Sequence, residues 1–166
     1  MAAFAPRKRL AQDTNVLFDL ADGKEIAHDF KEVFRTNGYA LVIAPMVVGE
    51  LHFLENHGDS KQRVFAARSL DNLSRWEINP FAIDSVNEAV AERFAVRLIQ
   101  TRLLPDGEIS DGLILAETSL AEIPLLVTSD KHLLDIDETA LKLAFHDADL
   151  LPVSPVHPRR LLRALR

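Results

Sequence analysis

Short apolar runs alternate with segments of helical periodicity along this chain, and this alternation constrains the fold more than any other feature. Residues 39–44 (YALVIA) are apolar throughout, as expected of a strand that is buried on both faces. Residues 25–36 before this run have a helical pattern, and Pro45 after it suits the first turn of a helix that continues to Asn56. The alternation predicts an α/β fold of three layers, in which a central, mostly parallel sheet is flanked by helices.

The rest of the chain continues this alternation. Further strands are expected at 8–13 (which runs into the apolar residues 16–20), at 124–128, at 150–153 and, weakly, at 77–83. Further helices are expected at 60–75, 84–103, 109–121 and 139–145, with a short helical turn at 129–134. Two of these helices have apolar stripes that we expect to face inward: Val64, Ala67, Leu70 and Leu73 in the first, and Val86, Val90, Phe94 and Leu98 in the second.

A chain of 166 residues with 48% hydrophobic residues has enough apolar material for one folded core. No Gly/Ser-rich linker divides it, so we expect a single domain over residues 10–155, with a basic segment at 1–9 and a basic tail at 156–166. The absence of cysteine excludes disulfides, a thiolate zinc site and a cysteine nucleophile. No apolar window is long enough to span a membrane and no signal-peptide core is present, so the expected location is the cytoplasm.

The net charge of −6 averages two opposite distributions. The chain has 19 basic and 25 acidic residues, and seven of the basic ones lie in residues 1–9 and 159–166, which contain no acid. Residues 10–158 therefore hold 12 basic and 25 acidic side chains, a net charge of −13. A body this acidic argues against a broad nucleic-acid-binding face. The basic ends are compatible either with binding RNA phosphates or an acidic partner, or with solvated termini.

Four acids lie at expected strand ends or on the helices that follow. Asp13 ends the first strand, Glu50 lies in the helix that Pro45 starts, Asp111 lies in the first turn of a later helix, and Asp130 follows the strand at 124–128. Ligands of parallel sheets bind beyond the carboxyl ends of the strands, where we expect these side chains to meet. Taken alone, an Asp after a strand is more often a helix cap or turn residue, and a Glu on a helix face is more often solvated, so the prediction depends on the combination.

Converging carboxylates repel one another and are costly to bury unless they are paired or bound to a cation. Mg²⁺ and Mn²⁺ prefer oxygen ligands and keep several waters, which suits an open carboxylate cluster. Such an ion lowers the pKa of a bound water, orients a phosphodiester and stabilises the leaving oxygen. The residues alone therefore predict a metal-dependent site for phosphoryl transfer.

Four segments in order along the chain resemble the PIN-domain nucleases, the fold of many toxin ribonucleases of VapBC-type toxin–antitoxin systems. These segments are DTNVL at 13–17, VVGEL at 47–51, DGLILA at 111–116, and LLVTSD at 125–130 followed by HLL at 132–134. The resemblance spans residues 10 to about 153. It departs from the compact toxins in the additional length at 57–75 and after Pro155, and in Gly112, which is a poor helix former.

The resemblance implies a PIN-like fold in which Asp13, Glu50, Asp111 and Asp130 are the catalytic residues and bind Mg²⁺ or Mn²⁺. It further implies an endoribonuclease that cleaves RNA with a metal-activated water. An antitoxin protein and a second copy of the chain, forming a homodimer, are the partners that such a toxin would have. A catalytically inactive PIN-fold binding or regulatory protein is the alternative from a different functional class.

Residues next to the four acids are candidates for supporting roles. Thr14 and Asn15 can support Asp13 or cap the next helix, Thr128 and Ser129 can orient Asp130, and Glu108 is either an auxiliary ligand or a solvated first-turn acid. Lys131 and His132 are possible substrate contacts or surface residues. No H-x-x-x-H pair is present, which argues against a zinc site.

Two other classes of protein also place acids at strand ends. An Asp-based phosphatase of the haloacid-dehalogenase type needs a second Asp two residues after the first, where this chain has Asn15. A response-regulator receiver needs a phosphorylated Asp after its third strand, and the sequence offers no good candidate. Both alternatives are therefore weaker than the nuclease.

Overall fold

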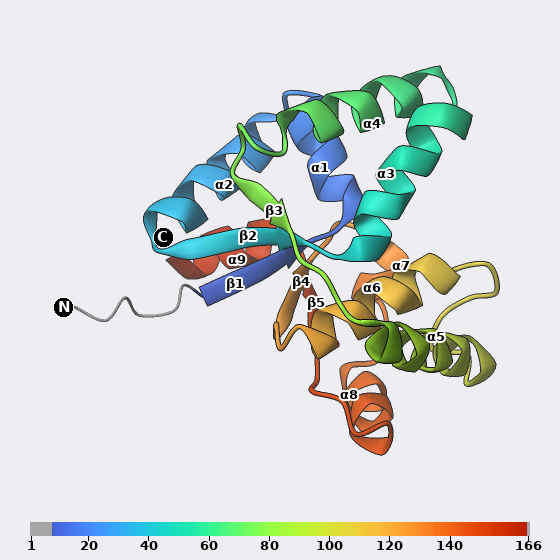
Figure 1. The fold of residues 1–166 in the computed structure, drawn as a ribbon. Coiled ribbons are helices and arrows are strands. Elements are labelled where there is room, and N and C mark those ends of the chain that lie inside the picture. The colour runs from blue at the N-terminus through green and yellow to red at the C-terminus, as the bar shows by residue number, and fades with distance from the viewer. Residues whose placement is uncertain (1–7, 166) are drawn as a thin grey trace.

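The computed structural model describes residues 8–165 and contains a five-stranded parallel sheet with the strand order β3-β2-β1-β4-β5 (Figure 1). The strands are β1 (Lys8–Gln12), β2 (Tyr39–Ile43), β3 (Ile78–Pro80), β4 (Leu125–Val127) and β5 (Ser154–Val156). The helices are α1 (Thr14–Ala21), α2 (Glu25–Thr36), α3 (Pro45–His57), α4 (Ser60–Asn72), α5 (Ser85–Gln100), α6 (Ile109–Leu120), α7 (Lys131–Leu134), α8 (Glu138–Asp147) and α9 (Pro158–Leu165). The predicted α/β architecture is confirmed, and every strand pair in the sheet is parallel.

Helices cover both faces of the sheet. Figure 1 shows α1, α2 and α4 on one side and α5 and α6 on the other, while α3 contacts α1, α4 and α6. The apolar stripe of α2 packs its buried Phe34 against Tyr39 at the start of β2, with ring centroids 5.2 Å apart. On the other side, Phe94 of α5 stacks on Phe145 of α8 at 4.6 Å. The two apolar layers bury the central strands, as their continuous apolar sequences predict.

The strand order places a topological switch point between β1 and β4. The first strand, β1, lies in the middle of the sheet; β2 and β3 follow on one side of it, and β4 and β5 on the other. The backbone amide of Asp13, just beyond β1, donates to the carbonyl of Val127 in β4 at 2.9 Å. The ends of β1 and β4 therefore lie side by side at the point where such sheets bind ligands.

Gly112 permits the close approach of two helices. A Cβ atom built on Gly112 in α6 would lie 2.9 Å from both the Cα and the Cβ of Ala95 in α5. These separations are far below an ordinary carbon–carbon contact of roughly 3.5–4.0 Å. The glycine that is unfavourable for helix formation is thus explained by the packing of α5 on α6 next to Asp111.

Two details of the predicted helix faces are wrong. Val64 in α4 is 49% exposed and Val86 in α5 is 73% exposed. In α4 the buried positions are Ala66 and Ser69, and the Ser69 hydroxyl donates to the carbonyl of Leu17 in α1 at 3.4 Å. Small residues let α4 lie close to α1, so its inner face is rotated away from Val64. Val86 lies in the first turn of α5, whose buried residues begin at Ala91.

The last strand lies later than predicted. β5 is Ser154–Val156, whereas Leu150 is half-buried and Leu151 is 55% exposed in the irregular segment before it. Pairing of β5 with β4 fixes this position, because Ser154 donates to the carbonyl of Pro124 and Val156 lies opposite Val127. Apolarity alone does not locate β5, because Leu150, Leu151 and the strand itself all consist of uncharged residues.

The basic ends take part in the fold where they are described. Lys8 and Arg9 form the start of β1, and the Arg9 guanidinium donates to the carbonyl of Ala121. The tail forms α9, which packs on α2 with Leu162 buried and with Arg159, Arg160 and Arg163 exposed. Residues 1–7 and 166 of the two predicted basic segments lie outside the described residues. The division into a central domain and basic ends stays a prediction.

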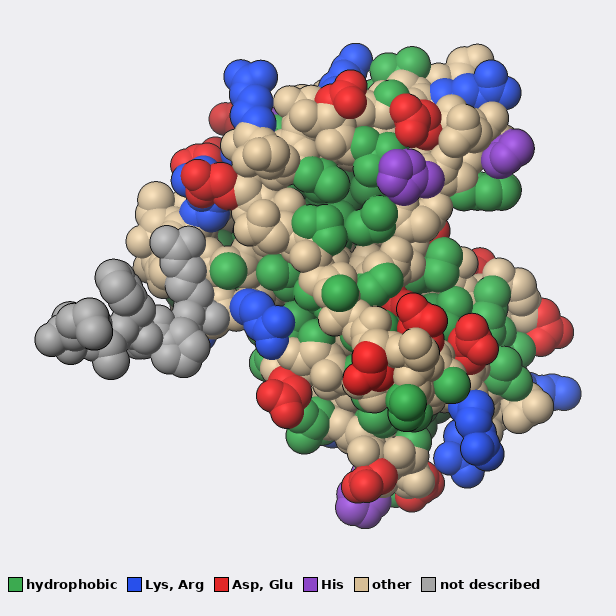
Figure 2. Space-filling model, viewed as in Figure 1, with side chains coloured by type: hydrophobic (Ala, Val, Ile, Leu, Met, Phe, Trp, Pro, Cys, Tyr) green, Lys and Arg blue, Asp and Glu red, His purple; other side chains and the backbone are tan. Residues whose placement is uncertain are grey.

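The described surface has no wide basic area on the face shown in Figure 2, where Lys and Arg side chains are separated by acidic, apolar and neutral ones. This matches the acidic balance of residues 10–158. No helix within residues 8–165 is both long enough and apolar enough to cross a membrane.

Candidate functional site

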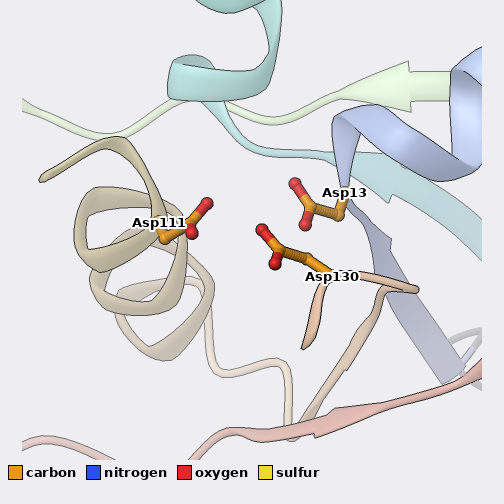
Figure 3. A group of neighbouring side chains, drawn as sticks. All are labelled: Asp13, Asp111 and Asp130. Atoms are coloured by element: carbon orange, nitrogen blue, oxygen red, sulfur yellow. The ribbon is translucent and has the colours of Figure 1, made fainter. Parts of the chain in front are cut away.

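Three aspartates converge beyond the carboxyl ends of β1 and β4. Asp13 follows β1 directly and is the N-cap of α1, Asp130 is the N-cap of α7 after β4, and Asp111 lies in the first turn of α6. Figure 3 shows that their carboxylates point toward one another from these three elements. One carboxylate oxygen from each lies within 4.8 Å of the others. We call Asp13, Asp111 and Asp130 the aspartate cluster.

The cluster has the properties of a cation site. Asp13 and Asp111 are 3% and 7% exposed, and Asp130 is half-buried. The buried Oδ2 atom of Asp111 has no hydrogen-bond partner among the described residues. An unsatisfied buried carboxylate oxygen is costly, and a hard divalent cation with oxygen ligands is the group that would satisfy it. The donor set therefore fits a divalent metal ion.

A polar network holds Asp13 in place. Its Oδ1 accepts from the backbone amide of Thr14 at 2.8 Å, and its Oδ2 accepts from the Thr128 hydroxyl at 2.8 Å and from the Asn15 amide at 3.1 Å. The Thr128 Oγ1 atom in turn accepts from the backbone amide of Asp130 at 3.0 Å. Thr128 thus links the two aspartates that follow β1 and β4.

Asn15 connects the α1 and β4 sides of the site. Its side-chain nitrogen donates to Asp13 and to Thr128 Oγ1, both at 3.1 Å. Its Oδ1 accepts from the Ser129 amide at 3.0 Å and from the Ser129 hydroxyl at 3.1 Å. Both ends of this amide are fully used, and a carboxylate could not make the same bonds. The position at which an Asp-based phosphatase needs its second Asp is therefore built for an amide.

Glu50 lies beside the aspartate cluster and does not belong to it. Its Oε2 accepts from the Thr14 hydroxyl at 2.8 Å, which ties α3 to the start of α1. Burial, together with the negative charges of Asp13, Glu108 and Asp130, raises the pKa of Glu50 to about 7, although the Thr14 hydrogen bond opposes this. Glu50 is thus close enough to the cluster for the charges of Asp13 and Asp130 to raise its pKa.

Burial is the largest cause of raised carboxyl pKa values throughout the site. It raises the pKa of Asp13 despite the hydrogen bonds from Thr128 and Thr14. The pKa of Asp111 is also raised, first by burial and then by the charges of Asp13, Asp130 and Glu108. Without a cation, the folded protein therefore retains protons on carboxyls that would be ionised in water.

The remaining predicted residues, Glu108, Lys131 and His132, lie outside the aspartate cluster. Glu108 is the N-cap of α6 and is half-buried, and its charge acts on both Glu50 and Asp111. Lys131 and His132 are exposed in α7, and the backbone amide of His132 donates to Asp130 Oδ1 at 2.9 Å. Their proposed contacts with substrate stay predictions.

Glu117 was not among the residues predicted from the sequence. It is 7% exposed on α6, and its Oε1 accepts from the backbone amide of Met46 in the first turn of α3 at 2.8 Å. Ala44, the N-cap of α3, makes no side-chain cap, so Glu117 satisfies this helix end from another helix. One indication of a buried Glu117 is present in the sequence, its position directly after the apolar residues 113–116. Its hydrogen-bond partner Met46 could not be inferred, because the two residues are 71 positions apart.

Solved structures share this fold. VapBC2 from Rickettsia felis, bound to a DNA fragment from its promoter, matches with a TM-score of 0.61 and 15% identity over 90% of this chain and 98% of that chain. VapBC-1 from nontypeable Haemophilus influenzae matches with a TM-score of 0.55 and 12% identity over 91% and 98% of the two chains. This chain has a PIN-type fold. FitAcB from Neisseria gonorrhoeae agrees, with a TM-score of 0.54 and 18% identity over 90% and 98%.

The PIN-type fold confirms the architecture that the sequence resemblance implied, and at these identities it shows the fold alone. No family model matches the sequence, and no curated protein matches it significantly. Three of the four acids named by the PIN resemblance, Asp13, Asp111 and Asp130, lie together in the aspartate cluster, and the catalytic roles of all four stay predictions.

Proposed function

We propose that this PIN-type chain is a divalent-metal-dependent endoribonuclease that hydrolyses RNA phosphodiesters. The observation that carries the proposal is the aspartate cluster at the switch point of the sheet, with the unpartnered Oδ2 of Asp111 inside it. A carboxylate cluster that can bind a cation suits phosphodiester hydrolysis. It suits an Asp-based phosphatase less well, because that reaction needs a second Asp where this chain has Asn15.

In this proposal, Asp13, Asp111 and Asp130 hold Mg²⁺ or Mn²⁺, and Glu50 acts at the edge of the cluster. A bound divalent ion would supply Lewis acidity, which lowers the pKa of a water and stabilises negative charge on phosphate oxygens. Thr128 and Asn15 keep Asp13 oriented, and Thr14 keeps Glu50 turned toward the cluster. Burial and the neighbouring acids raise the pKa of Glu50 to about 7 in the metal-free protein, and a cation held by the cluster would lower it, leaving a carboxylate at the edge of the site.

Incubation with RNA tests this proposal. Purified protein should cut single-stranded RNA internally with Mn²⁺ or Mg²⁺ and should not cut it in EDTA. Asp111→Asn should lower the cleavage rate at least a hundredfold, because an amide oxygen is a far weaker ligand than a carboxylate. Asp135→Asn is the matched control, since Asp135 is an exposed C-cap of α7 outside the cluster, and it should cleave normally. Equal activity of the natural protein and Asp111→Asn would contradict the site.

We further propose that the chain is the toxin of a toxin–antitoxin pair that acts in the cytoplasm, binds an antitoxin protein and forms a homodimer. The support is the structural likeness to the VapBC2, FitAB and VapBC-1 complexes. Expression of the natural chain should arrest growth, and expression of Asp111→Asn should not. If the chain neither cuts RNA nor arrests growth yet folds normally, the PIN-fold binding protein becomes the better interpretation.

A further inference from the structure

A second feature lies next to the aspartate cluster, on the side where α9 begins. A cavity of about 260 Å³ opens between α1, α2 and the start of α9. We call it the α9 pocket and define it by Asp19, Lys24, Phe30, Ser129, His157 and Arg159. We propose that the α9 pocket binds the nucleotide of an RNA strand that adjoins the cleaved phosphodiester. The identity of the ligand as RNA rests on the proposed nuclease function.

The topology places this pocket at the same edge of the sheet as the cluster. β5 runs parallel to β4, so the segment that follows β5 leaves the sheet beside the segment that carries Asp130. Ser129 connects the two places directly, since it lines the pocket, precedes Asp130 and donates its hydroxyl to Asn15. A strand whose phosphodiester lies at the cluster therefore has its neighbouring nucleotide within reach of the pocket.

The polar rim of the pocket offers donors suited to a phosphate or ribose. The guanidinium of Arg159 is exposed and forms no ion pair with any described residue. The Nδ1 atom of His157 accepts from the backbone amide of Arg159 at 3.1 Å, so a neutral ring carries its proton on Nε2, for which residues 8–165 provide no acceptor. The one carboxylate of the rim, Asp19, is paired with Lys24 at 2.9 Å.

Part of the pocket lining is apolar and buried. The side chains of Phe30, Ala27 and Val16 line it and belong to the buried core. Buried apolar side chains together with the exposed donor Arg159 match a base or ribose together with its phosphate. The volume of about 260 Å³ lies just below the roughly 300–1,000 Å³ of small-molecule sites, which limits the occupant to a single nucleotide unit.

Charge also favours a nucleotide at this position. Residues 10–158 carry −13, so a polyanion approaching the cluster meets mostly acidic surface. Arg159 supplies a cation to the α9 pocket, and no acid of the described residues forms an ion pair with it. This local charge lets a strand bind at one edge of an acidic protein.

Binding of adenosine 5′-monophosphate, followed by NMR amide shifts in EDTA, tests the pocket independently of cleavage. We expect saturable shifts at Ser129, His157 and Arg159. Arg159→Ala should weaken this binding at least fivefold, and Arg159→Lys should retain it within twofold because it keeps the charge. Arg163→Ala is the matched control, since Arg163 is exposed on the same helix and does not line the pocket. Melting temperatures of all variants should agree within about 2 °C.

RNA binding gives a second test through its salt dependence. Loss of one phosphate contact should reduce the slope of log K against log salt by about 0.7 for a single strand. We expect this reduction for Arg159→Ala and no reduction for Arg163→Ala. Equal slopes in both variants, or nucleotide shifts that Arg159→Ala leaves unchanged, would overturn the proposal.

These outcomes separate the pocket from the nuclease. If RNA is cut with Mn²⁺ and Arg159→Ala has an unchanged KM, the pocket assignment fails and the nuclease stands. If adenosine 5′-monophosphate binds as expected but RNA is never cut, the nuclease fails and a nucleotide site remains. A raised KM with an unchanged kcat in Arg159→Ala supports both.

Discussion

The carboxylate of Asp111 lowers the stability of the metal-free protein, although it is the group proposed to bind the metal. Burial and three neighbouring acids raise its pKa, so at neutral pH the metal-free folded state must keep a proton that the unfolded chain releases. Asp111→Asn removes this cost, and its amide can donate to the neighbouring carboxylates of the cluster. We expect it to stabilise the metal-free protein by roughly 1–3 kcal/mol at pH 7, measured by urea unfolding in EDTA. An equal or lower stability would show that Asp111 is not strained by its surroundings.

Asp13→Asn is a less informative change at the same site. Asp13 Oδ2 accepts from both Asn15 and Thr128, so an amide nitrogen at this position would face two donors. The gain from removing a charge is then offset by lost hydrogen bonds. The distinction between these two aspartates depends on contacts that the sequence does not reveal.

Glu50 makes the stability of the metal-free protein fall as pH rises. Its folded pKa of about 7 exceeds the ordinary value of 4.5, so the folded state binds more protons between these values. Stability is therefore lost as pH rises from about 4.5 to about 7. Relative to Glu50→Gln, the natural protein should lose about 2–3 kcal/mol of unfolding free energy between pH 5 and pH 8 in EDTA. If the difference in unfolding free energy between the two proteins does not change with pH, the pKa of Glu50 is not raised by folding.

At the scale of elements, the packing of α5 on α6 depends on Gly112. Gly112→Ala should destabilise the fold by roughly 1–3 kcal/mol, because the new methyl group meets the backbone of Ala95. Gly49→Ala in α3 is the matched control, since its Cβ would have only the flexible Met46 side chain nearby, at 3.7 Å. It should be neutral or stabilise by up to about 1 kcal/mol, through better helix propensity. Thermal unfolding of both variants checks this, and a stable Gly112→Ala would refute the close packing.

The sequence was sufficient for most of the elements, although β5 lies later than predicted, and it was insufficient for their contacts. The strand-end rule placed Asp13 and Asp130 together, because strand ends and the parallel sheet can both be inferred from apolar runs. The exposed Val64 and Val86 were mispredicted because the angle of a helix on its neighbours decides which of its apolar residues are buried. Glu117 was missed because its partner Met46 lies on another helix. These differences all arise from tertiary packing, which local periodicity does not encode.

At the scale of the molecule, a protein of negative net charge can still bind a negatively charged substrate. The described body is acidic, yet several of its acids do not belong to the solvated surface: Asp13 and Asp111 are buried and Glu50 is half-buried. A divalent ion would neutralise part of the cluster, and Arg159 lines the α9 pocket together with Ser129, the residue before Asp130. An acidic protein can thus accept a polyanion at one edge of its sheet while repelling it elsewhere.

Calorimetric titration of Mn²⁺ into the metal-free protein tests the central claim most directly, because it measures the cation site without reference to any substrate. The natural protein and Asp135→Asn should bind Mn²⁺ with the same affinity. Asp111→Asn should bind it at least tenfold more weakly, although it is the more stable protein without metal. Equal Mn²⁺ affinity in the natural protein and Asp111→Asn would show that the aspartate cluster is not a metal centre.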